Sequence, residues 1–326
     1  MRLNKDKMLK TTEIAEKSMK ENLVPGLAMA YISEGKTIKF DTLGIANPAT
    51  GEKVRLTTHF EAASLTKPIF AKIVLKLAGE GVLDLDAPLS KYAPEAMPSN
   101  DPRCKDITAR QVLSHGTGLP DWGNAPVEML FTPGTSFGYS GKGYTYLQDV
   151  VEKLTGRRVD DLMQTEVFNP LRMDDAAMVW TGPLNRTLAR TVDAEGKIEP
   201  PRDRCQHSVA IEPNCAFSLH VTIKDYPKFV ESVIGDSALI EEISSYKNPA
   251  DYGVEWGLGW GLYKDIIWHW GDNGGFKSLI CFDPETKDGI LIHTNGFNGL
   301  QVCYDVAGYV MEYSFDNIKE MVAHAE

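Results

Sequence analysis

Three serine–lysine pairs, each with the lysine three residues after the serine, could supply a nucleophile and its own base. They are Ser33–Lys36, Ser64–Lys67 and Ser244–Lys247. The first pair lies in a predicted hairpin turn and the third in a polar loop, so both are expected to be solvated. The second pair stands where an apolar run becomes a predicted helix, with apolar residues recurring at helical spacing over residues 69–77. It is therefore the candidate catalytic pair.

The expected position of this pair at a helix start favours proton transfer. Residues three apart on one helical turn are neighbours. The positive end of the helix dipole disfavours a protonated Lys67 and favours negative charge developing on Ser64. Burial would lower the lysine pKa further, so that Lys67 can accept the Ser64 proton. The structural alternative is a helix-capping serine beside a surface lysine.

Two further segments carry candidate site residues. The loop-forming segment 133–144 presents Tyr139 just before a predicted helix, and a tyrosine beside a lysine cation can share proton transfer. His269-Trp-Gly271 ends a predicted edge strand, where Gly271 would let a substrate approach the backbone and an amide N–H face an oxyanion. The alternatives are a packed aromatic residue and an ordinary strand end.

The arrangement of predicted elements indicates an α/β chain of the α+β type. Short helices joined by Pro- and Gly-rich loops fill the middle of the chain. Strand patterns lie on both sides of it, over residues 27–33, 37–43, 257–263, 266–270, 278–282 and 289–294. We expect the last four to form an antiparallel meander. The predicted organisation is a sheet domain from residues 1–64 and 201–326, with residues 65–200 inserted as a mostly helical lobe.

Composition and spacing exclude several classes of protein. The formal net charge of -11 opposes binding of nucleic acid. No apolar stretch reaches the roughly 18 residues of a membrane helix, so no membrane span is expected. The five cysteines and seven histidines lack metal-binding spacing, so we expect reduced thiols, no metal and no cofactor. A G-x-S-x-G elbow is absent, which argues against an α/β-hydrolase. Without a signal peptide at its polar start the protein is expected to be cytoplasmic, or periplasmic or secreted if a leader has been trimmed.

Taken together, the motifs resemble the penicillin-recognising serine hydrolases, in particular their class C β-lactamase and D,D-peptidase-like branch. Residues 62–68 resemble the S-x-x-K signature, and Ser114-His-Gly-Thr-Gly-Leu-Pro120 a later segment of the family. Residues 133–144 resemble the Y-x-N region, and His269-Trp-Gly271 stands where the family has K-T-G or H-x-G. The resemblance covers most of the chain in the right order. It implies an antiparallel sheet flanked by helices, a mostly helical lobe and a site in the cleft between them.

The resemblance also implies roles for the matching residues. Ser64 would be the acylated nucleophile, and Lys67 and Tyr139 would share the general base and acid work. His269 would orient Tyr139 or the substrate. The backbone N–H groups of Ser64 and Asp272 would form the oxyanion hole. The residues expected to contact the substrate are Gly141, Trp270 and Gly271.

One departure from the family pattern concerns the substrate. The third residue of the Y-x-N element is Gly141, whereas the family's asparagine contacts the acyl-side amide of peptide-like substrates. Glycine supplies neither donor nor acceptor and is expected to leave space. Nearby tryptophans are expected to line an apolar acyl pocket: Trp122, Trp268 and Trp270. An esterase or amidase acting on a small molecule or short peptide is therefore the first hypothesis.

Two alternatives stay open. One is a true β-lactamase or D-alanyl-D-alanine carboxypeptidase. The other is a catalytically silent protein that binds peptidoglycan fragments or a partner. The sequence gives no information on the oligomeric state.

Overall fold

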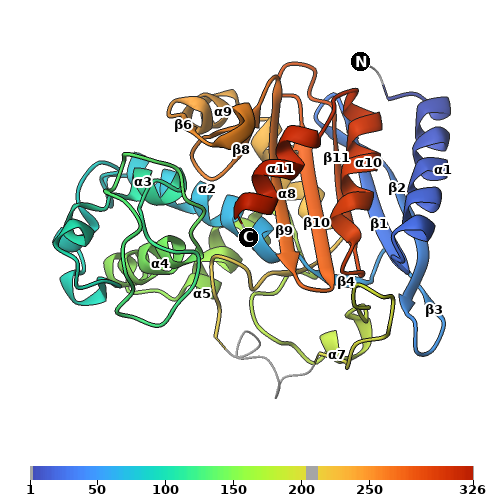
Figure 1. Cartoon of the computed structure of the whole chain (residues 1–326), viewed down its shortest axis with the longest axis horizontal. Helices are drawn as coiled ribbons and strands as arrows, with labels where there is room; N and C mark the ends of the chain where they lie inside the picture. The colour runs from blue at the N-terminus through green and yellow to red at the C-terminus, as the bar shows by residue number, and fades with distance from the viewer. Residues whose placement is uncertain (1–2, 203–211, 326) are drawn as a thin grey trace.

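A single large antiparallel sheet forms the centre of the computed structural model, which describes residues 3–202 and 212–325 (Figure 1). Within these residues nine strands follow the order β3-β2-β1-β11-β10-β9-β8-β7-β6. Their bounds are β1 Gly26–Ser33, β2 Lys36–Asn47, β3 Glu52–Lys53, β6 Asn248–Pro249, β7 Glu255–Trp256, β8 Gly261–Tyr263, β9 Ile266–Asn273, β10 Phe276–Phe282 and β11 Gly289–Thr294. The N-terminal hairpin joins the C-terminal meander through the β1–β11 pair, from Leu27 opposite Thr294 to Ile32 opposite Gly289.

Strand β1 shows why these apolar runs form a central sheet. All eight of its residues are buried, as in a strand covered on both faces. Alternate side chains point to opposite faces and enter two different cores. One core holds Ala28, Ala30 and Ile32, and the other holds Leu27, Met29 and Tyr31.

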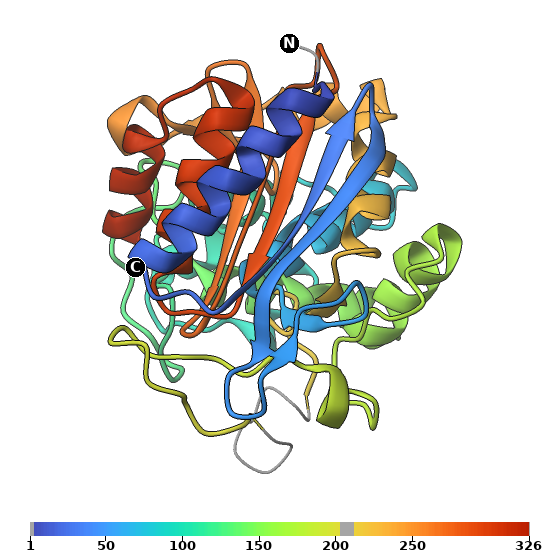
Figure 2. The ribbon, with the colours of Figure 1, turned by 90° about the vertical axis from the view of Figure 1, so that its right-hand side faces the viewer.

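Helices cover both faces of the sheet. Helices α1 (Lys5–Glu21), α10 (Gly299–Met311) and α11 (Asp316–Ala325) pack on one face, where Figure 2 shows the first two crossing in front of the strands. Helices α2 (Thr66–Gly79) and α8 (Tyr226–Ile234) contribute to the core on the opposite face. Helix α9 (Ser237–Ser244) follows α8. A small second sheet pairs β4 (His59–Glu61) with β5 (His220–Thr222).

The middle of the chain combines short helices with long connecting loops and lies beside the sheet (Figure 1). Its α-helices are α3 Ala109–Leu113, α4 Gly141–Thr155, α5 Val159–Met163, α6 Asn169–Leu171 and α7 Leu184–Thr187, with a π-helical turn over Gln164–Phe168. Short 3₁₀ turns occur at Ala63–Leu65 (η1), Leu89–Lys91, Pro94–Ala96, Pro102–Asp106 and Asp251–Gly253. Ser140 caps α4 by accepting a hydrogen bond from the Gly143 N–H, and Gly156 ends the helix at φ 66°.

The predicted fold class is confirmed: an antiparallel sheet is flanked by helices and accompanied by a helical region. The exact domain boundaries stay a prediction. The expectation of an edge strand at His269–Gly271 holds only in part: β9 is an inner strand that pairs with β10 and β8, but its pairing with β8 ends at Trp268. Four cysteines are buried free thiols, and Cys205 lies outside the described residues. No helix in the described part of the chain has the length and apolar character needed to span a membrane.

Candidate active site

Ser64 lies in the short turn η1 that leads from β4 into α2. The preceding residue, Ala63, has φ 50°, a left-handed conformation that is uncommon for a residue other than glycine. Side chains hold the turn: the Thr66 hydroxyl donates to the Ala63 carbonyl at 2.6 Å, and the Tyr226 hydroxyl donates to the Leu65 carbonyl at 2.8 Å. Ser64 is therefore fixed at the N-terminal end of α2, where the helix dipole favours negative charge.

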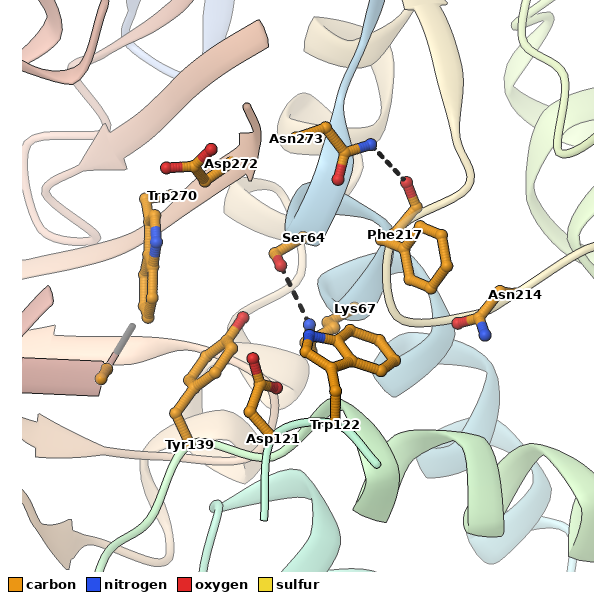
Figure 3. A pocket seen from close by; sticks show the side chains of 11 residues that line it. Ser64, Lys67, Asp121, Trp122, Tyr139, Asn214, Phe217, Trp270, Asp272 and Asn273 are labelled. Carbon is orange, nitrogen blue, oxygen red and sulfur yellow. Dashed lines mark hydrogen bonds between the residues drawn. The ribbon is translucent and has the colours of Figure 1, made fainter. Parts of the chain in front are cut away.

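Lys67 is fully buried beside Ser64. Its Nζ lies 3.0 Å from Ser64 Oγ and 3.0 Å from the Ala216 carbonyl oxygen (Figure 3). Burial lowers the pKa of Lys67 to about 8, although the negative charge of Asp121 opposes this shift. A neutral amine is therefore accessible near physiological pH within reach of the Ser64 proton. This is the geometry that general-base activation of a serine requires.

Tyr139 enters the same site from the loop before α4. Its hydroxyl end points toward Ser64 and Lys67 (Figure 3). Lys67 Nζ lies 4.7 Å from the centre of the Tyr139 ring. The ring also packs against Trp270, with a centroid distance of 4.6 Å. The structure thus brings the three predicted residues Ser64, Lys67 and Tyr139 together.

His115 holds the Tyr139 loop, and no role was assigned to it from the sequence. Its Nδ1 accepts a hydrogen bond from the Ser140 N–H at 3.0 Å, and its carbonyl accepts one from the Gly138 N–H at 2.8 Å. Its ring lies 4.1 Å from the Tyr139 ring, centre to centre. Burial and the charge of Lys67 hold the pKa of His115 well below its usual value, so the imidazole stays neutral and Nδ1 stays an acceptor. The one indication in the sequence was that His115 lies within residues 114–120, a stretch that resembles a segment of the family.

The end of β9 lies against the Ser64 turn. A Cβ atom at Gly271 would lie 2.3 Å from the Ala62 carbonyl oxygen, so only glycine allows this approach. Strand β8 pairs with β9 only as far as Trp268. Beyond Trp268, β8 does not cover the edge of β9. This close packing brings the end of β9 beside the Ser64 turn, and the oxyanion hole of the Ser64 and Asp272 N–H groups stays a prediction. The Asp272 carboxylate itself accepts from the Lys277 ammonium.

His269 does not border the pocket, contrary to expectation. It is fully buried, and its Nδ1 lies 2.7 Å from the Trp270 carbonyl oxygen. Its ring centre is 6.5 Å from that of Tyr139. Burial, reinforced by the charge of Lys67, lowers the pKa of His269 to about 3. A neutral, enclosed imidazole can affect a reaction only by supporting the residues packed against it.

A pocket of about 490 Å³ opens above Ser64. Its walls combine charged, amide and aromatic side chains (Figure 3). They are Ser64, Lys67, Asp121, Trp122, Tyr139, Asn214, Phe217, Trp270, Asp272, Asn273 and Ala325. Five of these lining residues belong to no motif recognised in the sequence: Asp121, Asn214, Phe217, Asn273 and Ala325. Trp268 is fully buried and does not line the pocket.

The expectation that Gly141 leaves space is wrong. A Cβ atom at Gly141 would lie 2.5 Å from the Trp122 indole ring and 3.1 Å from Asp121 Oδ1. The Gly141 N–H donates to Asp121 Oδ1 at 2.6 Å. Two side chains from the loop after α3 therefore occupy the position where a side chain at residue 141 would lie.

No metal centre accompanies this site: among residues 3–202 and 212–325, no group of three or more His, Cys, Asp or Glu side chains could hold a metal ion.

Comparisons with known proteins identify a matching family and several relatives. The family model described as Beta-lactamase matches residues 11–307. The protein flp of Staphylococcus aureus (strain N315) is 23% identical over 324 residues, covering 90% of this chain and 64% of the relative. The chain thus spans a little under two thirds of that relative's length. Esterase EstB of Burkholderia gladioli is 27% identical over 204 residues, covering 52% of this chain and 51% of the esterase.

Among solved structures, D-alanine carboxypeptidase AmpC from Burkholderia cenocepacia superposes with a TM-score of 0.80 at 19% identity. The match covers 94% of this chain and 99% of the carboxypeptidase. At this level of identity the likeness shows a shared fold.

Proposed function

Because the chain belongs to the beta-lactamase family, we propose that it is a serine hydrolase that works through an acyl-Ser64 intermediate. The observation that carries the proposal is the buried Lys67 Nζ, 3.0 Å from Ser64 Oγ. Burial lowers its pKa to about 8. Desolvation destabilises the charged form of a lysine, so a buried position is unfavourable for a lysine with a purely structural role.

The proposed reaction has two stages. Neutral Lys67 accepts the Ser64 proton while Oγ attacks the substrate carbonyl carbon, and the oxyanion that forms faces the N–H groups of Ser64 and Asp272. The tetrahedral intermediate then collapses, the leaving group takes a proton through Lys67 and Tyr139, and the acyl group stays on Ser64. A water molecule next attacks the acyl ester, gives up its proton to the same groups and releases the acid. Ser64 regains its proton in this step.

We propose esters as the preferred substrates. Gly141 lacks the side-chain amide that would pair with an acylamino group, and one such hydrogen bond contributes about 0.5–1.5 kcal/mol. An ester without that group loses nothing at this position. The similarity to an esterase supports the same choice. Turnover of β-lactams or D-alanyl peptides is the alternative.

A substrate panel with intact-mass detection tests both parts. Short-chain p-nitrophenyl esters, a chromogenic cephalosporin and a D-alanyl-D-alanine peptide are compared by kcat/KM, and a fluorophosphonate probe is used to label the nucleophile. We expect a covalent adduct that Ser64→Ala abolishes, and the highest kcat/KM with an ester.

Ser244→Ala is the matched control, because it removes the serine of another S-x-x-K sequence outside the pocket and should leave labelling unchanged. Labelling that persists in Ser64→Ala would place the nucleophile elsewhere. A cephalosporin turned over far better than the esters would replace the esterase proposal with a β-lactamase.

A further inference from the structure

The side chains that stand over Gly141 differ in chemistry from the amide that the family pattern puts there. Trp122 and Asp121 lie within 2.5 Å and 3.1 Å of the position of a Cβ at Gly141. A side-chain amide presents a donor and an acceptor, whereas a carboxylate presents acceptors alone. A substrate group that forms a hydrogen bond with the Asp121 carboxylate must therefore be a donor.

Among the described residues that line the pocket, Lys67 is the one cationic side chain near Asp121. Both carboxylates among the described lining residues are aspartates, and Asp272 is paired with Lys277. Asp121 forms no ion pair with a described residue, although it is close enough to Lys67 for the two charges to interact. Burial raises the pKa of Asp121, and the positive charge of Lys67 opposes that rise. Once Lys67 is in the neutral form required for catalysis, Asp121 has no cationic neighbour in the pocket.

Aromatic rings surround this carboxylate. Trp122 is 49% exposed, and its indole meets the ring of Phe217 edge to face at 5.1 Å, centre to centre. Tyr139 and Trp270 form the other side of the pocket (Figure 3). A carboxylate among aromatic faces is a favourable environment for an alkylammonium group, because the rings attract a cation and the carboxylate accepts its hydrogen bonds.

We infer that the pocket selects acyl donors that carry a free, protonated amino group next to the scissile carbonyl, as in aminoacyl esters or amides. The inference rests on the proposed serine hydrolase function and on the expectation that the acyl side of the substrate lies at residue 141. The ammonium donates to Asp121 and lies against Trp122. An N-acylated substrate would instead place a carbonyl oxygen against the Asp121 carboxylate. Because both groups are hydrogen-bond acceptors, they would repel each other.

Asp121 also has a structural contact, and the test must separate the two roles. Its Oδ1 accepts the Gly141 N–H at the start of α4. Asp121→Asn keeps an acceptor oxygen for this hydrogen bond and removes the charge. A purely structural role therefore predicts no change in substrate preference in this variant.

The experiment compares the benzyl esters of alanine (both enantiomers), N-acetylalanine and propionic acid, followed by release of benzyl alcohol. Assays at about pH 6.5 keep the amino group protonated, since an α-amino pKa is about 7.7–8.0. The wild type should favour one alanine ester over the N-acetyl ester. Asp121→Asn should reduce this preference about tenfold or more, as expected for a charge-assisted hydrogen bond. The preference is the kcat/KM of the alanine ester divided by that of the N-acetyl ester. Differences in intrinsic ester reactivity, and any effect of the substitution on the pKa of Lys67, cancel when this ratio is compared between the two proteins.

Asp86→Asn is the matched control, because it removes the same charge from a carboxylate that is 65% exposed and not part of the pocket. It should leave the preference unchanged. Ser64-dependent hydrolysis of the propionate ester without an amino preference, or a preference that Asp121→Asn leaves intact, would overturn this inference and keep the hydrolase proposal. Hydrolysis of none of the esters together with no fluorophosphonate adduct would overturn both.

Discussion

At the scale of single residues, the proposed chemistry depends on the buried Lys67. Its pKa is lowered to about 8 by burial, and Asp121 limits that shift. The local features of this pair were predictable from the S-x-x-K spacing at a helix start. The Asp121–Trp122 wall was not predictable, because it depends on how the loop after α3 folds back onto residue 141 and no periodic pattern reports such a contact.

The first prediction is the pH dependence of activity. Because the proposed mechanism uses the neutral amine of Lys67 as the base, kcat/KM for a neutral ester should rise with pH, reach half of its maximum near pH 8 and level off above it. Asp121→Asn should move the midpoint to lower pH, since the Asp121 charge favours protonated Lys67. The measurement is a pH–rate profile of both proteins. A flat profile between pH 6 and 9 would exclude Lys67 as the titrating base.

The second prediction concerns residue 141. In the wild-type background Gly141→Asn should lower the free energy of unfolding by about 1–3 kcal/mol, because the new side chain overlaps the Trp122 indole. In a Trp122→Ala background the same change should cost less, and only there should cephalosporin turnover improve. Urea denaturation and cephalosporin assays of the four proteins test this. Equal destabilisation in both backgrounds would show that Trp122 is not the obstacle.

At the scale of elements, the site depends on three segments that the chain brings together from distant positions: η1 with α2, the loop before α4, and the end of β9. Apolar runs revealed β8 to β11, because strands buried on both faces carry few polar residues. Helix α11 was missed, although Ala325 at its end lines the pocket. Its pattern is amphipathic but short, and its apolar residues are buried by tertiary packing with the core on the α10 side of the sheet, which the sequence pattern alone does not reveal.

The third prediction tests the contact between β9 and η1. Gly271→Ala puts a methyl group 2.3 Å from the Ala62 carbonyl and must push the strand away from Ser64. We expect a loss of kcat of tenfold or more, since one oxyanion donor contributes about 10²–10³. Gly79→Ala, in α2 with nothing within 4 Å of its Cβ, is the control and should be neutral or slightly stabilising. Full activity in Gly271→Ala, with folding verified by circular dichroism, would show that β9 does not contribute to the oxyanion hole.

At the scale of the whole molecule, the site has a cost in stability. A buried lysine whose pKa falls from 10.5 to about 8 disfavours the folded state while both states are protonated. As the pH rises above 8, folded Lys67 loses its proton before the unfolded form does, so the folded state becomes relatively more stable up to about pH 10.5. The folded state therefore bears an energetic penalty at the residue that the proposed mechanism uses as its base.

The fourth prediction follows from this destabilisation of the folded state by protonated Lys67. Lys67→Met should raise the free energy of unfolding at pH 7 by up to about 3 kcal/mol, at 1.36 kcal/mol per pKa unit, while abolishing hydrolysis. The gain should shrink at pH 9.5. Lys36→Met, at a lysine that is 76% exposed, should change stability little at either pH. Urea denaturation at both pH values measures these free energies of unfolding. A Lys67→Met protein that is less stable than the wild type at pH 7 would show that the buried lysine does not destabilise the fold.

The pairing of β1 with β11 also determines when the molecule can finish folding. Leu27 meets Thr294, so strands made first during synthesis must wait for strands made last. Until then β1 lacks its neighbour, and an apolar strand with an unsatisfied edge readily pairs with other chains. Contacts between such distant parts of a sequence form slowly. Refolding from denaturant should therefore be slow and give lower yields at higher protein concentration.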